Sequence, residues 1–144
     1  MAKLILFVDD DKLPMQYYVQ ALEKRGFEVQ RYFEPDNALE FIMKENTQIE
    51  VIIMDIMMPF GKYGADATKK GLITGVLLLD DIRKYCPNTP VIILTNVKNP
   101  KTHIKFEEGD LLKIIQKTDC PPFELVDLVN EVIPNTNKPT NFEK

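Results

Sequence analysis

Short, nearly continuous apolar runs that end in a polar side chain constrain the fold of this chain more than any other feature. Runs of this kind are typical of strands that are buried on both faces of a parallel sheet. Each is too short to cross a membrane. The four runs are Leu4–Val8, Ile49–Met54, Val91–Leu94 and Leu111–Gln116.

Amphipathic stretches lie between these runs and predict helices on both faces of the sheet. The predicted helices run from Pro14 to Gly26, where the glycine closes the helix, and over 35–44, 76–85, 100–108 and 122–133, the fourth being weak. A further short strand is predicted over 27–32. Met43 and Phe123 are expected among the inward-facing residues of their helices. This alternation of strands and helices predicts an α/β fold with a parallel sheet and right-handed crossovers.

Length and composition indicate one globular domain. The 144 residues suit a single domain, predicted at 1–133, and the polar segment 134–144 is predicted to be a flexible tail or linker. A formal charge of -4 argues against a general nucleic-acid binder, and the expected location is cytoplasmic, with no membrane association. Cys86 and Cys120 are predicted to be reduced thiols, and His103 a surface residue.

The polar residues that follow the apolar runs predict one site. The carboxyl ends of neighbouring parallel strands meet at the same edge of the sheet. Three carboxylates gathered there repel each other unless a cation offsets their charge, and Mg²⁺ prefers such oxygen ligands. A carboxylate can then attack phosphorus, while an ammonium group and a hydroxyl stabilise the phosphoryl oxygens. The residues concerned are Asp9, Asp10, Asp55, Thr95 and Lys117.

Four motifs in order resemble the receiver domains of bacterial response regulators, of the CheY type. They are LILFVDDD, VIIMDIMMP, VIILTN and IIQK, and TGVLLLDDIRK resembles the third helix of that family. The resemblance covers about residues 3–133. It implies a doubly wound (βα)5 fold with five parallel strands in the flavodoxin-like order 2-1-3-4-5.

The resemblance also implies roles for individual residues. Asp55 is then the phosphorylation site, and Asp9 and Asp10 bind Mg²⁺ together with Asp55 and the main-chain carbonyl of Met57. Thr95 is the switch hydroxyl and Lys117 contacts the phosphoryl group. The partners implied are a histidine kinase or phosphotransfer protein and a downstream protein. The expected activity is limited to self-phosphorylation and self-dephosphorylation, and the chain is either a stand-alone receiver or part of a longer protein.

The sequence departs from the family pattern at four places. About a dozen extra residues form an insertion at about 60–74, which is either a tolerated surface loop or a lid or docking loop carrying Gly61, Lys62, Lys69 and Lys70. Ile114 stands where an aromatic residue is common, and Thr118 replaces a proline, so a trans peptide is expected there. Asn96 replaces a small residue. With apolar Met57 and Val97 flanking the site, we predict slow self-dephosphorylation.

Two other functions remain open on the sequence. Asp9-x-Asp11 superficially matches the first motif of haloacid-dehalogenase-like phosphatases, although Leu13 does not fit that motif. A receiver-derived interaction module without phosphorylation is the other alternative, against which the complete set of site residues argues. Asp11 itself is predicted to cap the helix that follows rather than to bind metal.

Overall fold

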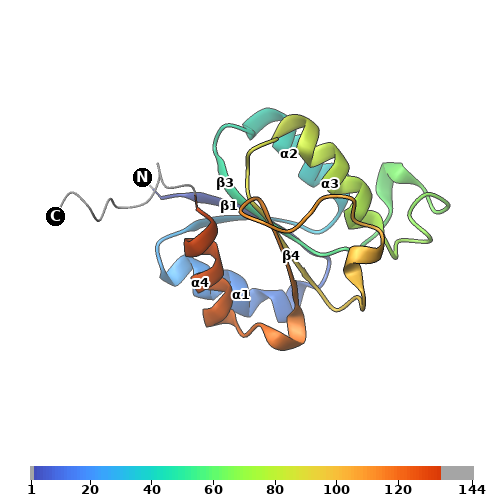
Figure 1. Ribbon diagram of the computed structural model, residues 1–144. Coiled ribbons are helices and arrows are strands. Elements are labelled where there is room, and N and C mark those ends of the chain that lie inside the picture. Colours follow the sequence, from blue (N-terminus) through green and yellow to red (C-terminus); the bar gives the residue numbers. More distant parts are fainter. Residues whose placement is uncertain (1, 134–144) are drawn as a thin grey trace.

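The computed structural model describes residues 2–133, in which a central parallel sheet lies between two layers of helices (Figure 1). All five strands are parallel, in the order β2-β1-β3-β4-β5. The predicted doubly wound fold with the order 2-1-3-4-5 is therefore confirmed. The strands are β1 Leu4–Val8, β2 Glu28–Tyr32, β3 Ile49–Met54, β4 Val91–Thr95 and β5 Leu112–Gln116.

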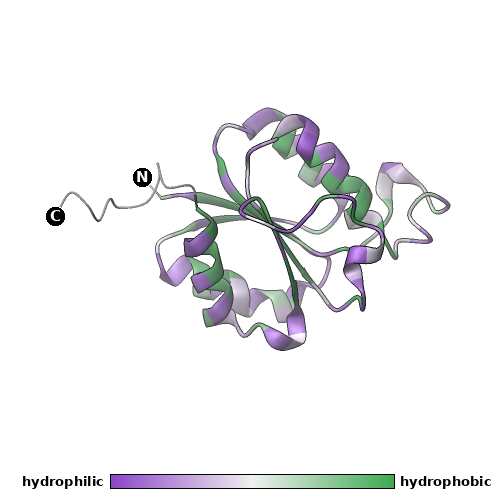
Figure 2. Ribbon diagram, in the orientation of Figure 1, coloured by the Kyte–Doolittle hydropathy of each residue, from purple (hydrophilic) through white to green (hydrophobic). Residues whose placement is uncertain are grey.

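Helices cover both faces of the sheet and bury two separate cores. Helices α1 (Lys12–Lys24) and α4 (Pro122–Val132) lie on one face, and α2 (Pro35–Glu45) and α3 (Thr74–Tyr85) on the other. Successive β1 side chains alternate between the two cores, because side chains of a strand point to opposite faces in turn. The apolar sides of the helices face the sheet in Figure 2. Burial on both faces explains the unbroken apolar runs.

The connection from β4 to β5 differs from the prediction. A helix over 100–108 is wrong, because only a 3₁₀ turn, Pro100–Thr102, forms there. Ile104 and Phe106 both pack against the core beneath α2 and α3. Residues i and i+2 point to the same side of an extended segment but to nearly opposite sides of a helix. The carboxylate of Glu108 accepts a hydrogen bond from the Ile114 amide (3.0 Å), which holds the end of the connection on β5.

Three local predictions are also corrected. Met43 and Phe123 are exposed, at 53% and 64%. Phe123 lies in the first turn of α4 and roughly 200° around the helix from buried Leu125, so it points away from the sheet. Asp11 does occupy the position before α1, but its side chain makes no capping hydrogen bond. Gly26 follows α1 with a φ of 92°, as expected for a closing glycine.

The segment between β3 and α3 is a loop, as its glycine-rich sequence predicts, and it contains internal hydrogen bonds. We call residues 60–73 the β3–α3 loop; it consists of a short 3₁₀ turn followed by further turns. Buried Thr68 accepts a hydrogen bond from the Gly71 amide (3.1 Å) and donates one to the Gly64 carbonyl (2.6 Å). Tyr63 donates to Asp81 on α3 (2.6 Å). These bonds fasten the loop to the body of the protein. That it is an insertion relative to the family stays a prediction.

Candidate functional site

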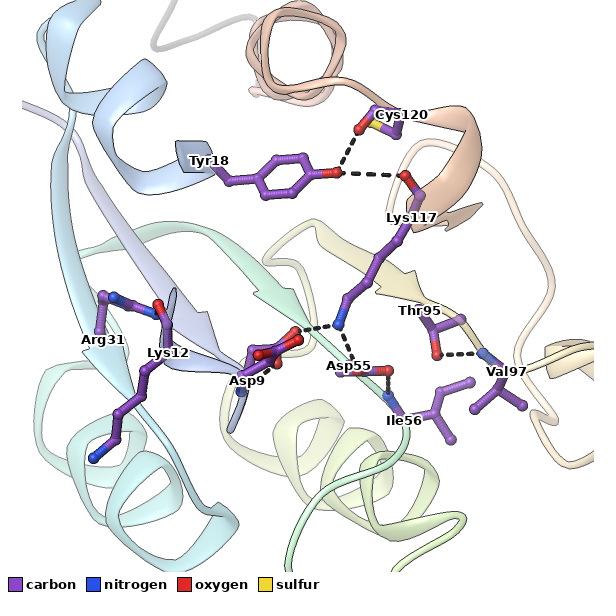
Figure 3. Close-up of polar contacts among 11 residues, drawn as sticks. Asp9, Lys12, Tyr18, Arg31, Asp55, Ile56, Thr95, Val97, Lys117 and Cys120 are labelled. Atoms are coloured by element: carbon purple, nitrogen blue, oxygen red, sulfur yellow. Dashed lines mark hydrogen bonds and ion pairs between the residues drawn. The ribbon is translucent and has the colours of Figure 1, made fainter. Parts of the chain in front are cut away.

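The ends of β1, β3 and β5 bring two carboxylates and one ammonium group together (Figure 3). The Lys117 Nζ atom lies 2.9 Å from Asp9 Oδ2 and 2.9 Å from Asp55 Oδ2. All three side chains are largely buried, with exposed fractions of 9%, 2% and 8% for Lys117, Asp9 and Asp55. Of the residues that sequence reasoning assigned to one site, these three are in direct contact.

Backbone amides fix the second oxygen of each carboxylate. Asp9 Oδ1 accepts from the Asp11 amide (2.9 Å), and Asp55 Oδ1 accepts from the Ile56 amide (2.6 Å). The backbone of both residues still belongs to the sheet, because the amides of Asp9 and Asp55 donate to Tyr32 and Val8 carbonyls, each at 3.1 Å. Each carboxylate therefore presents one oxygen to Lys117 and is oriented through the other.

Helix α3 begins against the backbone of Asp55. The Gly75 amide donates to the Ile56 carbonyl (2.7 Å). A Cβ atom at Gly75 would lie 2.3 Å from the Asp55 carbonyl oxygen and 2.6 Å from the Ile56 Cα atom, closer than atoms can approach. Only glycine fits here, and this explains the glycine in the TGVLLLDDIRK motif.

The site carries more negative than positive charge. With Asp10, three carboxylates face one ammonium group and leave a formal charge of −2 when all are ionised. Burial, followed by repulsion from Asp55, raises the pKa of Asp9 to about 6. Burial also raises the pKa of Asp10. Burial alone would lower the pKa of Lys117, but the charge of Asp55 and Asp9 outweighs it and the pKa rises. The site thus favours an added cation.

An open depression of about 300 Å³ lies over these groups. Exposed Asp10, Met57 and Asn96 line it together with Asp55 and Lys117. Among residues 2–133, no three His, Cys, Asp or Glu side chains stand in a ready-made metal cage, because Lys117 lies between Asp9 and Asp55. Mg²⁺ keeps several waters and needs only one or two carboxylates, so the donor set and its surplus charge fit Mg²⁺.

Thr95 lies at the end of β4, on the other side of Asp55 from Asp9 (Figure 3). It is fully buried, and its Oγ1 atom accepts a hydrogen bond from the Val97 amide (3.1 Å). The backbone that follows β4 is therefore tied to the hydroxyl that faces the site. Ile114 on β5 is half-buried and packs against the core on the α2–α3 side.

Sequence reasoning missed the residue that holds the Lys117 backbone. The Tyr18 hydroxyl on α1 donates to the Cys120 carbonyl (2.5 Å) and lies 3.4 Å from the Lys117 carbonyl (Figure 3). Burial raises the pKa of Tyr18, which keeps the hydroxyl a donor. All peptide bonds of the described chain are trans, as expected for Thr118. Tyr18 was predicted only as part of the apolar stripe of α1, and no local signal reveals a contact 102 residues away.

The loop residues predicted as a possible lid do not lie together. The Lys62 amide donates to Asp36 on α2 (2.9 Å), and a Cβ atom at Gly61 would collide with Asp36. Lys69 lines a second pocket beside the site, described below, and Lys70 is exposed. Cys86 and Cys120 are buried free thiols and His103 is exposed, as predicted.

A doubly wound sheet with an acid pair, a third acid and a lysine at its strand ends defines an α/β protein with a site at the switch point of the strand order. The family model described as "Response regulator receiver domain" matches residues 5–132. The chain belongs to that family and is a receiver domain of two-component signalling, typically a non-enzymatic signalling module. The assignment leaves the phosphatase alternative without support.

Individual relatives agree with this assignment. The regulatory protein VanRc of Enterococcus gallinarum is 32% identical over 66% of this chain, which spans only 35% of that protein's length. A receiver domain of a Francisella response regulator is 28% identical, with a TM-score of 0.64 over 90% of this chain and 95% of that one. A CheY-like receiver from Methanospirillum hungatei, at 24% identity and a TM-score of 0.68, shares the fold over 91% and 93% of the two chains.

No helix in residues 2–133 is long and apolar enough to span a membrane.

Proposed function

We propose that Asp55 accepts a phosphoryl group from a phosphohistidine of a histidine kinase or phosphotransfer protein. A carboxylate oxygen of Asp55 forms a bond to phosphorus while the bond from phosphorus to the imidazole nitrogen breaks. The nitrogen keeps that electron pair and later takes up a proton. The product is an acyl phosphate, and the receiver then changes the surface that it offers to a downstream protein.

One observation carries this proposal: Lys117 contacts both buried carboxylates at 2.9 Å. An ammonium group in this position can stabilise the negative charge on the phosphoryl oxygens while the group is transferred to Asp55. Asp55 is the better acceptor of the two, because it lines the open depression whereas Asp9 is 2% exposed. Thr95 ends β4, the strand next to β3, and its hydroxyl is proposed to hydrogen-bond a phosphoryl oxygen on Asp55.

Receiver domains usually bind Mg²⁺, and we assign its ligands to Asp9, Asp10, Asp55 and the main-chain carbonyl of Met57. When bound, the ion supplies positive charge to the phosphoryl oxygens. The raised pKa of Asp9 indicates that the positive charge of Lys117 alone does not offset the cost of ionising this buried carboxylate. Asn96 lines the same depression and limits access to the phosphoryl group.

Intact mass measured after incubation with acetyl phosphate and Mg²⁺ tests the proposal. The wild-type chain should gain one phosphate mass, and Asp55→Ala should gain none. Asp127→Ala, an exposed acid on α4, is the matched control and should react like the wild type. A phosphate gain that survives Asp55→Ala would disprove the assignment. No gain with any donor in the wild type would favour the unphosphorylated interaction module.

A further inference from the structure

A second pocket, of about 460 Å³, lies beside the site between the β3–α3 loop and the β4–β5 connection. In Figure 1 both segments lie at the N-terminal end of α3. Ile56 and Val97, which follow the phosphoacceptor strand and the switch strand, form its inner wall, and Leu72 lies at its edge. Leu72 is 53% exposed, so apolar surface continues from the pocket to the outside. The volume suits two or three apolar side chains or a small ligand.

The rim of this pocket is basic although the protein is acidic. Lys69, Lys98 and His103 line it and are exposed, and no Asp or Glu does so among the residues described. Within residues 2–133 these three side chains form no ion pair or hydrogen bond. By contrast, Lys62, Lys84 and Lys101 are each paired with an acid. The charges of Lys69 and Lys98 are therefore available to an acidic partner.

Two lining residues have strained backbones. Lys69 and Asn99 have φ values of 53° and 52°, in the left-handed region, which asparagine adopts more readily than lysine does. They stand on different segments, one on each side of the pocket. Strain of this kind persists only where surrounding contacts impose it, and it gathers at ligand clamps and switches. Residues with left-handed backbone conformations therefore border the pocket on both sides.

The pocket is connected to the site through the switch hydroxyl. The Val97 amide donates to Thr95 Oγ1, and Val97 and Lys98 are part of the pocket lining. Ile56, on the same wall, donates its amide to Asp55 Oδ1. A phosphoryl group on Asp55 competes for both of these contacts. If an occupant of the pocket shifts the Val97 or Ile56 backbone, occupation of the pocket and phosphorylation of Asp55 influence each other reciprocally.

We infer that this pocket docks a short peptide segment of a partner protein that carries aliphatic side chains flanked by carboxylates. Charge complementarity selects the occupant: the apolar walls take the aliphatic side chains, and Lys69, Lys98 and His103 pair with the acids. The inference rests on the proposed function for its coupling to phosphorylation, but docking itself requires only the pocket. It gives the β3–α3 loop the docking role that its sequence left open.

Binding of defined peptides to the full chain tests this inference. A heptapeptide of alternating Glu and Leu is compared by fluorescence anisotropy with two relatives, in which Lys replaces Glu or Ser replaces Leu. The Glu-Leu peptide should bind at least tenfold more tightly than either, and less tightly at high salt. The double variant Lys69→Glu, Lys98→Glu and the variant Leu72→Ser should each weaken binding at least fivefold. These residues are exposed, so the variants should fold, which a thermal melt checks.

The control is the double variant Lys24→Glu, Lys44→Glu, an equal charge reversal at exposed lysines on α1 and α2 that do not line the pocket. Equal weakening by this control, or equal binding of all three peptides, would overturn the inference. Octanoate binding as tightly as the peptide would assign the pocket to small amphipathic anions, and concentration-dependent dimerisation lost in Leu72→Ser would assign it to a second copy.

Intact mass in the same samples separates the two proposals. Phosphorylated chain should bind the peptide with an affinity changed at least threefold, and unchanged affinity would disprove the coupling. Absence of a phosphate gain together with selective peptide binding would refute the proposed phosphorylation and leave the docking site standing.

Discussion

The buried cluster of Asp9, Asp55 and Lys117, which we call the corner, and the pocket beside it lie at neighbouring strand ends but are built differently. In the corner, Asp9, Asp55 and Lys117 each follow a strand directly, are nearly buried and are fully paired. In the pocket, the charged residues stand on loops, are exposed and have no partner in the described chain. Sheet register therefore brings the charged groups of the site together, whereas the pocket forms where two loops meet.

The largest expected effect comes from disrupting the corner at Gly75. Alanine there would force α3 away from the backbone of Asp55 and Ile56, since its Cβ atom collides with both. We expect a loss of about 2–3 kcal/mol in the free energy of unfolding, measured with denaturant, because overpacking costs about this much. Phosphorylation by acetyl phosphate should also slow, because the same backbone carries Asp55, the proposed acceptor.

Gly109→Ala is the matched control, because a Cβ atom at Gly109 meets nothing within 4 Å. It lies in the β4–β5 connection just before β5 and should change stability by less than about 0.5 kcal/mol. Equal effects of the two substitutions would contradict the view that the corner is rigid and the connection tolerant.

The second prediction concerns the charge buried in the corner. The pKa of Asp9 is raised from 3.8 to about 6, so the folded state binds this proton more tightly than the unfolded state does. Stability contributed by the protonated form is present below about pH 4 and is lost as the pH rises to about 6. In the absence of Mg²⁺, Asp9→Asn should therefore stabilise the protein by about 1–2 kcal/mol at pH 7.5 and by little at pH 4.

Thermal or denaturant unfolding at both pH values measures this difference. Asp127→Asn, which replaces an exposed acid, should show no such dependence on pH. If the proposed ligands bind Mg²⁺, its addition at pH 7.5 should reduce the stability difference between Asp9→Asn and the wild type, because the variant has one carboxylate fewer. If Asp9→Asn and the wild type differ in free energy of unfolding by the same amount at pH 4 and pH 7.5, the charge of Asp9 is compensated in the folded protein.

The contrast between the two regions also explains what the sequence could predict. Four of the five strands and the contact of Asp9, Asp55 and Lys117 follow from apolar runs and the residues that end them, because parallel strands must bring those ends together. The helix over 100–108 was wrong, since the spacing of Ile104 and Phe106 fits an extended segment. The hydrogen bond from the Tyr18 hydroxyl to the Cys120 carbonyl could not be predicted, because nothing in the local sequence specifies a partner so distant along the chain. The pocket likewise depends on two loops meeting.

The third prediction tests whether Tyr18 positions the lysine of the corner. Tyr18→Phe removes the hydroxyl that bonds to the Cys120 carbonyl and leaves that acceptor without its partner. We expect a loss of about 1 kcal/mol in the free energy of unfolding. Phosphorylation, measured well below the melting temperature, should slow because the Lys117 backbone is less constrained. Tyr17→Phe, at a residue that is 66% exposed, should alter neither property. Unchanged phosphorylation in Tyr18→Phe would remove Tyr18 from the site.

The smallest expected effect lies at the border between the two regions. Met57 is 44% exposed and lines the depression over Asp55 with Asn96, so an apolar side chain flanks the path of an attacking water. We predict that the wild-type acyl phosphate lasts minutes or longer. Met57→Asn adds a group that can orient water and should shorten this lifetime roughly two- to tenfold, well below the effect of a full general base, which is about 100-fold or more.

The decay of the phosphorylated mass after removal of the donor measures this lifetime, and stability should stay unchanged because Met57 is exposed. Met43→Asn is the control, since Met43 is similarly exposed on α2 and lies outside the depression. A wild-type lifetime of seconds would contradict the prediction directly. A lifetime unaffected by Met57→Asn would mean that the lifetime is set deeper in the corner, by Lys117 and the carboxylates, and that the loops govern docking alone.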